Sequence, residues 1–265
     1  TPPVRLQLCI MLRKSIVSVT KVSKALFSAN NVRCLSAKPQ QSDQMSINYH
    51  IALPEEADEV MDFLEKNHYP HVPTMSALNV NCKEIKEAGL ETARKHIADD
   101  MSLLVRDGNT GEVVGASILY EMKGQPIEYF KSLCDRWKDH PSYPHWKLLF
   151  DLHDGLDLYQ IYNNPILLHG RTYCAKREYG ALGIGTGINI ASAKQVMKKY
   201  PKNKSVFIFG EGIGAFSNKI MKKMGYEFHR VINYDSYEID GKFPFKQLSE
   251  TSPHKFSTVG AWKMQ

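Results

Sequence analysis

A glycine-rich turn at residues 180–187 carries the clearest chemical signal in the sequence. Its four glycines follow an apolar segment expected to be a strand and precede one expected to be a helix. Glycine lets the backbone turn tightly and lets a ligand approach the unpaired N–H groups of a helix start. Because a helix N-terminus carries about half a positive charge, this turn suits a pyrophosphate. A plain turn with small residues for close helix packing is the alternative.

A dinucleotide-binding oxidoreductase would need a different spacing. Its fingerprint is Gly-x-Gly-x-x-Gly, with an acid about 20 residues later at the end of the next strand. Here the spacing is Gly183-x-Gly185-x-Gly187, one residue short, and Lys204 and Ser205 stand where the acid should be. The turn also follows a middle strand instead of the first one. An enzyme that binds NAD or flavin is therefore disfavoured.

The turn resembles the acetyl-CoA pyrophosphate loop of the GNAT N-acetyltransferases, usually written Arg/Gln-x-x-Gly-x-Gly/Ala. Residues 179–185 read Tyr-Gly-Ala-Leu-Gly-Ile-Gly, and residues 223–226 resemble the Lys-Leu-Gly-Phe that follows the fourth helix of that superfamily. Three further segments resemble the insect arylalkylamine N-acetyltransferases: 157–162, 232–243 and 252–254. The similarity covers about residues 47–264.

The resemblance implies direct transfer of an acetyl group from acetyl-CoA to a small primary amine, without a metal. The strand around Tyr173–Ala175, including Cys174 and Ala175, would lie beside the cofactor and offer an N–H to the carbonyl oxygen that becomes negative. Cys174 could also be only a buried structural thiol. The pyrophosphate would be held by the backbone N–H groups of Leu182, Gly183, Ile184, Gly185 and Thr186.

Four positions depart from the family pattern. The Arg/Gln position of the loop is Gly180, and Val72 stands where the insect-type enzymes carry a catalytic Glu before a proline. Met221 replaces the usual acid Tyr. Ile213 replaces the first of two serines four residues apart, while Ser217 matches the second. The expected proton acceptor is therefore absent from its usual place.

Histidines are the candidates to replace that acceptor. His68 and His71 lie beside the position of the missing Glu, and imidazole has a suitable pKa range for a base. His254 matches a Pro-His pair near the acceptor site of the insect enzymes, and Ser217 either contacts the CoA thiol or only caps its helix. The predicted catalytic residues are His71, Ser217 and His254. The alternative for His71 is an exposed loop histidine, and the alternative for His254 is a turn histidine. A water molecule could also act as the base. Glu211 is either a partner for a cationic amine or a helix-dipole partner.

The acceptor amine stays open at the level of the sequence. An arylalkylamine is favoured by the resemblance, and a polyamine or an amino acid is not excluded. The four departures also motivate a second function, a non-catalytic acyl-CoA binder that kept the loop and lost the base. A binder would hold CoA without releasing thiol with any amine.

An α/β fold must position these residues. Alternation and turn signals predict strands at 46–52, 102–107, 112–121, 166–175, 205–210, 226–239 and 256–264. Periodicity and capping signals predict helices at 54–68, 82–99, 183–200 and 215–224, and a helical insertion at 126–164 before the fourth strand. The order predicts a sheet of mixed direction flanked by helices. The resemblance narrows this to the GNAT acyl-CoA-binding fold, mostly antiparallel, in one domain over 46–265.

Composition and charge limit the other function classes. Of 265 residues, 43% are hydrophobic and 23% charged, which excludes disordered and coiled-coil chains. The net charge of +6 lies entirely in residues 1–45, which hold seven Lys or Arg and one acid, so residues 46–265 are neutral overall. No nucleic-acid partner is therefore predicted. The oligomeric state stays open.

Residues 1–45 resemble a leader. They are rich in Ser, Lys and Arg, their only acid is Asp43, and a helix drawn over 12–27 is amphipathic. Residues 33–36, Arg-Cys-Leu-Ser, resemble a matrix-protease cleavage site. A mitochondrial transit peptide and a location in the matrix are therefore predicted. A disordered tail, or upstream sequence joined to a chain that starts at Met45, would leave a cytoplasmic protein.

Two further classes are excluded by simple patterns. The five cysteines contain no Cys-x-x-Cys pair, so neither a disulfide framework nor a cysteine-ligated zinc site is predicted. No run approaches about 18 apolar residues without a charge, so no membrane span is predicted.

Overall fold

The computed structural model describes residues 46–264. The predicted leader, with its cleavage site, lies outside the described residues, and its targeting role stays a prediction. The single domain over 46–265 also stays a prediction.

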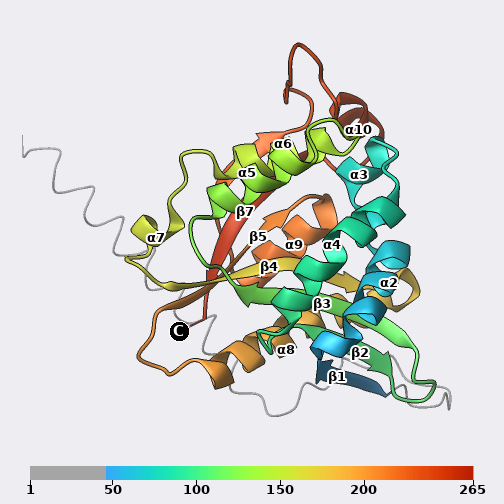
Figure 1. Ribbon diagram of the computed structural model, residues 1–265, viewed down its shortest axis with the longest axis vertical. Coiled ribbons are helices and arrows are strands. Elements are labelled where there is room, and N and C mark those ends of the chain that lie inside the picture. The colour runs from blue at the N-terminus through green and yellow to red at the C-terminus, as the bar shows by residue number, and fades with distance from the viewer. Residues whose placement is uncertain (1–45, 265) are drawn as a thin grey trace, which may run out of the picture. The chain divides into compact units, whose positions relative to one another are not determined.

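One open sheet runs through the described part in the order β1-β2-β3-β4-β5-β7-β6 (Figure 1). Its strands are β1 (Ile47–Ile51), β2 (Leu103–Asp107), β3 (Val113–Glu121), β4 (Ile166–Ala175), β5 (Val206–Gly212), β6 (Glu227–Asn233) and β7 (Phe256–Lys263). Neighbouring strands are antiparallel except β4 and β5, which are parallel. The prediction of a mixed, mostly antiparallel sheet is confirmed.

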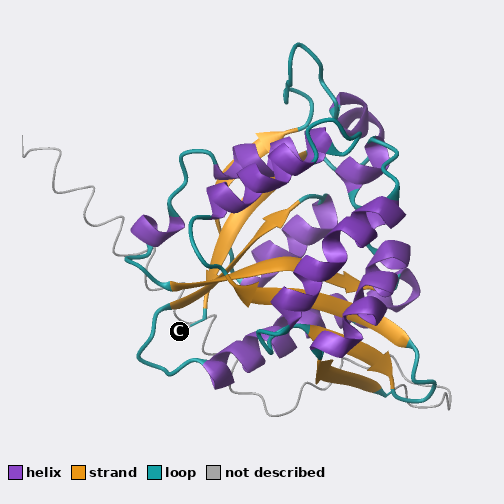
Figure 2. Ribbon diagram, in the orientation of Figure 1, coloured by secondary structure: helices purple, strands orange, loops and turns teal. Residues whose placement is uncertain are grey.

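Helices pack on both sides of this sheet (Figure 2). The longer ones are α2 (Ala57–Asn67), α4 (Cys82–Ile97), α5 (Pro126–Arg136), α6 (Tyr143–His153), α8 (Ile184–Lys199) and α9 (Ala215–Met224). The short ones are η1 (Pro54–Glu56), η2 (Tyr69–His71), α3 (Pro73–Ala77), α7 (Leu158–Ile161), η3 (Arg177–Leu182) and α10 (Lys246–Thr251). Helices α2, α4, α5 and α6 share one large apolar core with the sheet, while α8 packs on β2 and β3 through a separate cluster.

Local signals in the sequence explain where several helices begin and end. The Asn81 side chain accepts a hydrogen bond from the backbone N–H of Lys83 and caps α4. Gly225 follows α9 with φ +89°, the left-handed conformation that ends many helices, as predicted. Gly183 has φ +77° directly before α8, so the glycine-rich turn needs glycine there for its backbone.

The long strand predicted over 226–239 is wrong beyond Asn233. The chain leaves the sheet because the fully buried Tyr234 packs beneath it, with its hydroxyl hydrogen-bonded to Ser257 Oγ at 2.6 Å and to the Ile213 carbonyl. Positive φ angles at Asp240 (+49°) and its neighbour then form a tight turn. Alternation in sequence could not reveal this, because the partners of Tyr234 lie about 20 residues away on both sides.

Two other predictions were too coarse. The helical insertion predicted at 126–164 consists of α5, α6 and the short α7. Helices α3 and α10 were missed, since a segment of five or six residues has too few turns to show a period.

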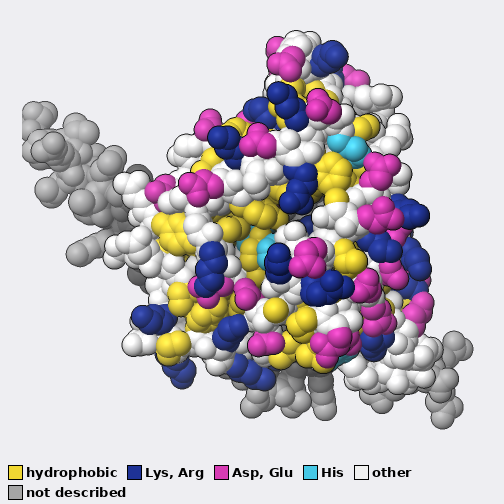
Figure 3. Space-filling view, in the orientation of Figure 1, with side chains coloured by type: hydrophobic (Ala, Val, Ile, Leu, Met, Phe, Trp, Pro, Cys, Tyr) yellow, Lys and Arg dark blue, Asp and Glu magenta, His cyan; other side chains and the backbone are white. Residues whose placement is uncertain are grey.

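The surface mixes charges of both signs. Figure 3 shows Lys and Arg interspersed with Asp and Glu over one face, as expected for a segment with equal numbers of each. Among residues 46–264, no helix is long and apolar enough to cross a membrane.

Helix α9 is fastened to the sheet by a buried amide. Asn218 Oδ1 accepts from Thr258 Oγ1 at 2.6 Å, and Asn218 Nδ2 donates to the Phe256 carbonyl at 3.3 Å, so α9 is tied to β7. Gly212 at the end of β5 leaves room for this amide, because a Cβ there would lie 1.9 Å from Asn218 Oδ1. The amide of Asn218 therefore fixes the position of α9 against β7, beside the end of β5.

We expect Gly212→Ala to lower the free energy of unfolding by about 1–3 kcal/mol, since the added methyl overpacks a site that cannot open without breaking the Asn218 bonds. Urea unfolding followed by circular dichroism measures the change. Gly180→Ala is the matched control, because nothing lies within 4 Å of its Cβ position, and we expect a change within about 0.5 kcal/mol. Equal stability of the two variants would contradict the packing argument.

Candidate active site

The two central strands pair only along part of their length. Parallel pairing joins residues 166–169 of β4 to residues 206–209 of β5 and ends at His169 and Phe209. Beyond this point β4 continues along β3, and β5 continues along β7. The two strands therefore separate, and their facing backbone edges have no recorded strand pairs beyond His169.

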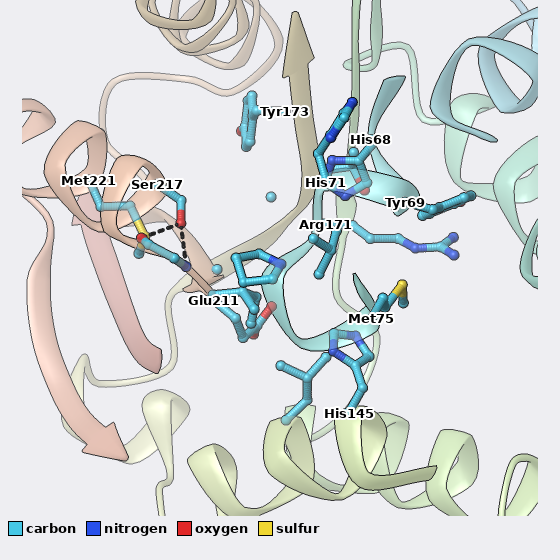
Figure 4. A pocket seen from close by; sticks show the side chains of 18 of the residues that line it. His68, Tyr69, His71, Met75, His145, Arg171, Tyr173, Glu211, Ser217 and Met221 are labelled. Atoms are coloured by element: carbon cyan, nitrogen blue, oxygen red, sulfur yellow. Dashed lines mark hydrogen bonds between the residues drawn. The ribbon is translucent and has the colours of Figure 1, made fainter. Parts of the chain in front are cut away.

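A cavity of about 330 Å³ opens where the strands separate. Its walls come from residues 170–173 of β4, from Gly210 and Glu211 of β5 with the two residues that follow this strand, and from the start of α9. Further walls come from the end of α2 with the segment that follows it, and from α5 and α6. Figure 4 shows Ser217 and Met221 of α9 on one side of the cavity and His68 and His71 on the other. The predicted site residues that line it are His71, Gly185, Ser217 and His254. Those that do not are Cys174, Ala175, Leu182, Gly183, Ile184 and Thr186.

The glycine-rich turn ends at the cavity. The first hydrogen bond of α8 runs from the Gly187 N–H to the Gly183 carbonyl. The N–H groups of Ile184, Gly185 and Thr186 precede that bond, so they have no partner within the helix. Three donors in one turn at the positive end of a 16-residue helix are the groups that an anion-binding site built only from backbone atoms would use.

Cys174 and Ala175 end β4 with their outer edge paired to β3. The Cys174 Sγ donates to the Asn67 carbonyl at 3.4 Å, and burial raises the pKa of the thiol to about 12. Cys174 is therefore a neutral buried thiol and not a nucleophile. Any contact of this segment with a cofactor would come from its backbone.

Ser217 and His254 both hold the start of α9. Ser217 Oγ donates to the Gly214 carbonyl at 3.0 Å and accepts from the Gly214 N–H at 3.1 Å. His254 Nδ1 accepts from the Ala215 N–H at 3.0 Å. Since burial lowers the pKa of His254, the ring is neutral at pH 7 and its proton sits on Nε2. His254 can therefore donate a hydrogen bond into the cavity, but its accepting nitrogen is already used.

His71 and His68 differ in their surroundings. His71 is exposed, and its ring makes no hydrogen bond within the described part, so the ring is free to contact a bound molecule. Burial, reinforced by the charges of Arg171 and His71, lowers the pKa of His68 to about 4. His145 lies deeper, with Nδ1 2.7 Å from Thr74 Oγ1, and burial lowers its pKa to about 3. The rings of His68 and His145 on this side of the cavity are therefore neutral.

Glu211 belongs to a buried network that the sequence did not reveal. His153 Nε2 donates to Oε1 at 2.7 Å, and His169 Nε2 donates to Oε2 at 3.0 Å. Tyr120 OH lies 2.8 Å from His169 Nδ1. Burial alone would raise the pKa of Glu211, but the charges and hydrogen bonds of the two histidines hold it at about 2. Glu211 is thus a permanent carboxylate at the cavity wall, with a side chain only 6% exposed.

Arg171 also lines the cavity and was not singled out by the sequence. It occupies a β-bulge of β4, where the register passes from Ile118 opposite Thr172 to Leu119 opposite Gly170. A bulge redirects the side chain of its extra residue. A single Arg within a strand that holds no other Lys, Arg, Asp or Glu was the signal that could have marked it.

The fold is similar to solved structures of N-acetyltransferases. Arylalkylamine N-acetyltransferase 2 from Aedes aegypti matches with a TM-score of 0.70 and 16% identity, covering 83% of this chain and 99% of that one. A polyamine N-acetyltransferase from Drosophila melanogaster matches with a TM-score of 0.68 and 14% identity, covering 82% and 100%. A mosquito arylalkylamine N-acetyltransferase like 5b matches with a TM-score of 0.67 and 16% identity, covering 82% and 100%.

No protein-family model matches the sequence, and no curated protein matches it. The structural similarity nevertheless spans the described domain and nearly all of each solved chain. The chain has the GNAT fold, and the fold prediction is confirmed.

The low pKa of His68 predicts a loss of stability in acid. A histidine whose pKa is lower in the folded chain binds fewer protons there than when unfolded, so stability falls as the pH drops from about 6.5 toward 4. We expect His68→Gln to reduce the slope of unfolding free energy against pH in this window by up to one proton, about 1.4 kcal/mol per pH unit. Urea unfolding at half-unit steps from pH 4 to pH 7.5 measures both slopes.

The slope that remains in His68→Gln has other sources, because His145 and His96 also have lowered pKa values. Unfolding at pH 7.5 serves as the control for an intact fold. Identical slopes for the wild type and His68→Gln would show that His68 does not titrate in this window.

Proposed function

We propose that this protein is an acetyl-CoA-dependent N-acetyltransferase that acetylates a small primary amine. The observation that carries the proposal is the separation of β4 and β5 beside the N-terminus of α8. An extended molecule with amide groups can bind along the facing strand edges as a further strand would, while its pyrophosphate meets the N–H groups of Ile184, Gly185 and Thr186. Acetyl-CoA has both parts in that order.

The chemistry is an acyl transfer that needs one proton acceptor and one proton donor. An ammonium group first gives a proton to a base, and the amine nitrogen then attacks the thioester carbonyl carbon. A C–N bond forms, the C–S bond breaks with its electron pair going to sulfur, and the thiolate takes up the second proton from nitrogen. The products are an amide, a thiol and one released proton.

His71 is the proposed base, because its ring lines the cavity and has no hydrogen-bond partner in the described part. Ser217 faces it across the cavity (Figure 4). It is the proposed hydrogen-bond donor near sulfur, once its hydroxyl turns away from the Gly214 carbonyl. His254 supports the start of α9 through Ala215 and can donate from Nε2. Backbone N–H groups of β4 next to Cys174 and Ala175 would stabilise the carbonyl oxygen as it becomes negative.

An amine that carries an arylalkyl group is the acceptor class that we favour, with or without a further polar substituent. The cavity is lined by Tyr69, Tyr129, Phe130 and Trp146, which suit an aromatic group. Solved structures of similar fold include enzymes named for arylalkylamines and for polyamines. Glu211 adds a buried carboxylate that attracts an ammonium group.

Thermal melting of residues 46–265 with acetyl-CoA, CoA or NAD tests the proposal. A ligand that binds only the folded chain raises the melting temperature, so we expect a rise with acetyl-CoA and CoA and none with NAD. Thiol release with a panel of amines follows. No shift with either CoA species would overturn the proposal, while a shift without thiol release from any amine would leave a binder that lacks catalysis.

Thr186→Glu tests the anion site within the folded protein. An acid in the first turn of α8 favours the helix but repels a pyrophosphate, so we expect at least about a tenfold loss of CoA affinity without a lower melting temperature. Thr186→Gln is the matched control, with the same shape and no charge. Equal affinities of these two variants would place the pyrophosphate elsewhere.

His71→Gln should lower kcat by about 100-fold, since a positioned base contributes about that much. We expect KM for acetyl-CoA to change by less than about threefold, because proton transfer is not part of cofactor binding. His50→Gln makes the same change on β1, where His50 Nε2 pairs with Glu56 outside the cavity, and should leave kcat unchanged. A kcat for His71→Gln equal to that of the wild type would assign the base to another group or a water.

A further inference from the structure

Arg171 lines the cavity, and its positive charge has no counter-ion among the described residues. Figure 4 shows the side chain extending from β4 toward Tyr69, below His68. Its Nη2 lies 3.5 Å from the position that a Cβ on Gly89 would take, an ordinary van der Waals distance, so the guanidinium packs closely against α4. A cation therefore lies between the cavity wall and this helix.

Within residues 46–264, no hydrogen bond or ion pair to Arg171 is recorded, and its Nη1 is buried without any partner. The groups that interact most with its charge are the hydroxyls of Tyr129, Tyr69 and Tyr120. Tyrosine hydroxyls carry no charge at neutral pH. The guanidinium is thus surrounded by neutral groups, although it stays protonated at any physiological pH.

The charge of Arg171 also affects two neighbouring histidines, His68 and His96. After burial, the charge of Arg171 is the next contribution that lowers the pKa of both His68 and His96, to about 4 and about 3. These histidines are consequently neutral and cannot add to the positive charge. They also cannot offset it.

A buried unpaired charge costs folding free energy, and breaking or omitting its partner is one of the larger destabilising effects in proteins. The Arg106 guanidinium shows the usual solution in this chain, with two hydrogen bonds to Glu59 at 2.6 and 2.8 Å. The missing partner at Arg171 is readily explained if a ligand supplies it. A carboxylate matches a guanidinium with two parallel hydrogen bonds.

The cavity holds one further charge. Among the described residues that line it, Arg171 is the only Lys or Arg and Glu211 the only acid. Each lies two residues past the last β4–β5 pair on its own strand. A molecule with one negative and one positive group complements this pair, whereas a simple amine leaves Arg171 uncompensated.

We propose that the acceptor is an amino acid or a similar small amine whose carboxylate binds Arg171. This inference rests on the proposed acetyl transfer and refines its acceptor class. The apolar and aromatic walls near Tyr129, Phe130 and Trp146 would hold an apolar side chain. The product would be an N-acetylated amino acid.

Matched acceptors that differ only by the carboxylate test the proposal on the wild-type protein. Thiol release from acetyl-CoA is measured with phenylalanine against phenethylamine, and with leucine against isoamylamine. We expect kcat/KM to be at least tenfold higher for the carboxylated member of each pair. Equal values, or a preference for the amines without carboxylate, would overturn the proposal while leaving the acetyltransferase assignment intact.

Arg171→Met removes the charge and keeps much of the side-chain volume. We expect the ratio of kcat/KM between phenylalanine and phenethylamine to fall by about 100-fold, because a site built for a polar group discriminates strongly by it. Arg171→Lys keeps the charge but not the paired hydrogen bonds. Its ratio of kcat/KM should therefore lie between those of the wild type and Arg171→Met. Arg106→Met is the matched control, since that guanidinium lies outside the cavity, and should keep the wild-type ratio.

Binding provides a readout that does not depend on turnover. In the presence of CoA, phenylalanine should raise the melting temperature of the wild type and not that of Arg171→Met. Without ligands, Arg171→Met should melt at a higher temperature than the wild type, since it removes an unpaired buried charge. If no amine releases thiol but phenylalanine still shifts only the wild type, acetyl transfer fails and the carboxylate site stands. No shift in the wild type would overturn the carboxylate site.

Discussion

Beyond His169 and Phe209, the facing backbone groups of β4 and β5 have no strand to pair with. Backbone N–H and C=O groups away from bulk water need hydrogen-bond partners. The strands cannot close on each other, because β3 and β7 hold their outer edges. The sheet therefore maintains an opening whose backbone groups must be satisfied by water or by a ligand.

Most of the proposed cofactor site would use backbone atoms at this opening. The N–H groups at the start of α8 and the edge of β4 do not depend on particular side chains. On the proposed function, Gly180 can therefore stand where similar loops carry Arg or Gln, because the backbone N–H groups of the turn remain. The acceptor side is different, because protons and charges there need specific side chains.

The two charges in the cavity are handled in opposite ways. Glu211 has two histidine donors and stays ionised inside the protein. Arg171 has no partner in the described part of the chain. Glu211 can stabilise the folded protein without a ligand, whereas a buried and unpaired Arg171 lowers its stability, which the proposed carboxylate would offset. Because Glu211 has two donors and Arg171 has no partner in the described part, Arg171 says more about the acceptor.

Val72 and Met221, which depart from the acetyltransferase pattern in sequence, agree with this difference between the cofactor side and the acceptor side. Val72 is buried and stands before α3, while Met221 lines the cavity beside Ser217. Neither can move a proton. The histidines at positions 68 and 71 occupy the wall next to Val72, but burial separates their properties, which the sequence alone did not distinguish.

The sequence by itself determined the local features: the strands that alternate clearly, the start of α8 at Gly183 and the end of α9 at Gly225. These depend on backbone preferences and neighbours within one turn, so a single segment contains the information. Only the tertiary structure decided where the strand after Glu227 ends, since Tyr234 is buried by residues distant in sequence. The tertiary structure also decided which charged side chains of the site have partners. Glu211 meets histidines 58 and 42 residues away, and Arg171 meets no acid in the described part, because electrostatic environment is set by packing across the fold.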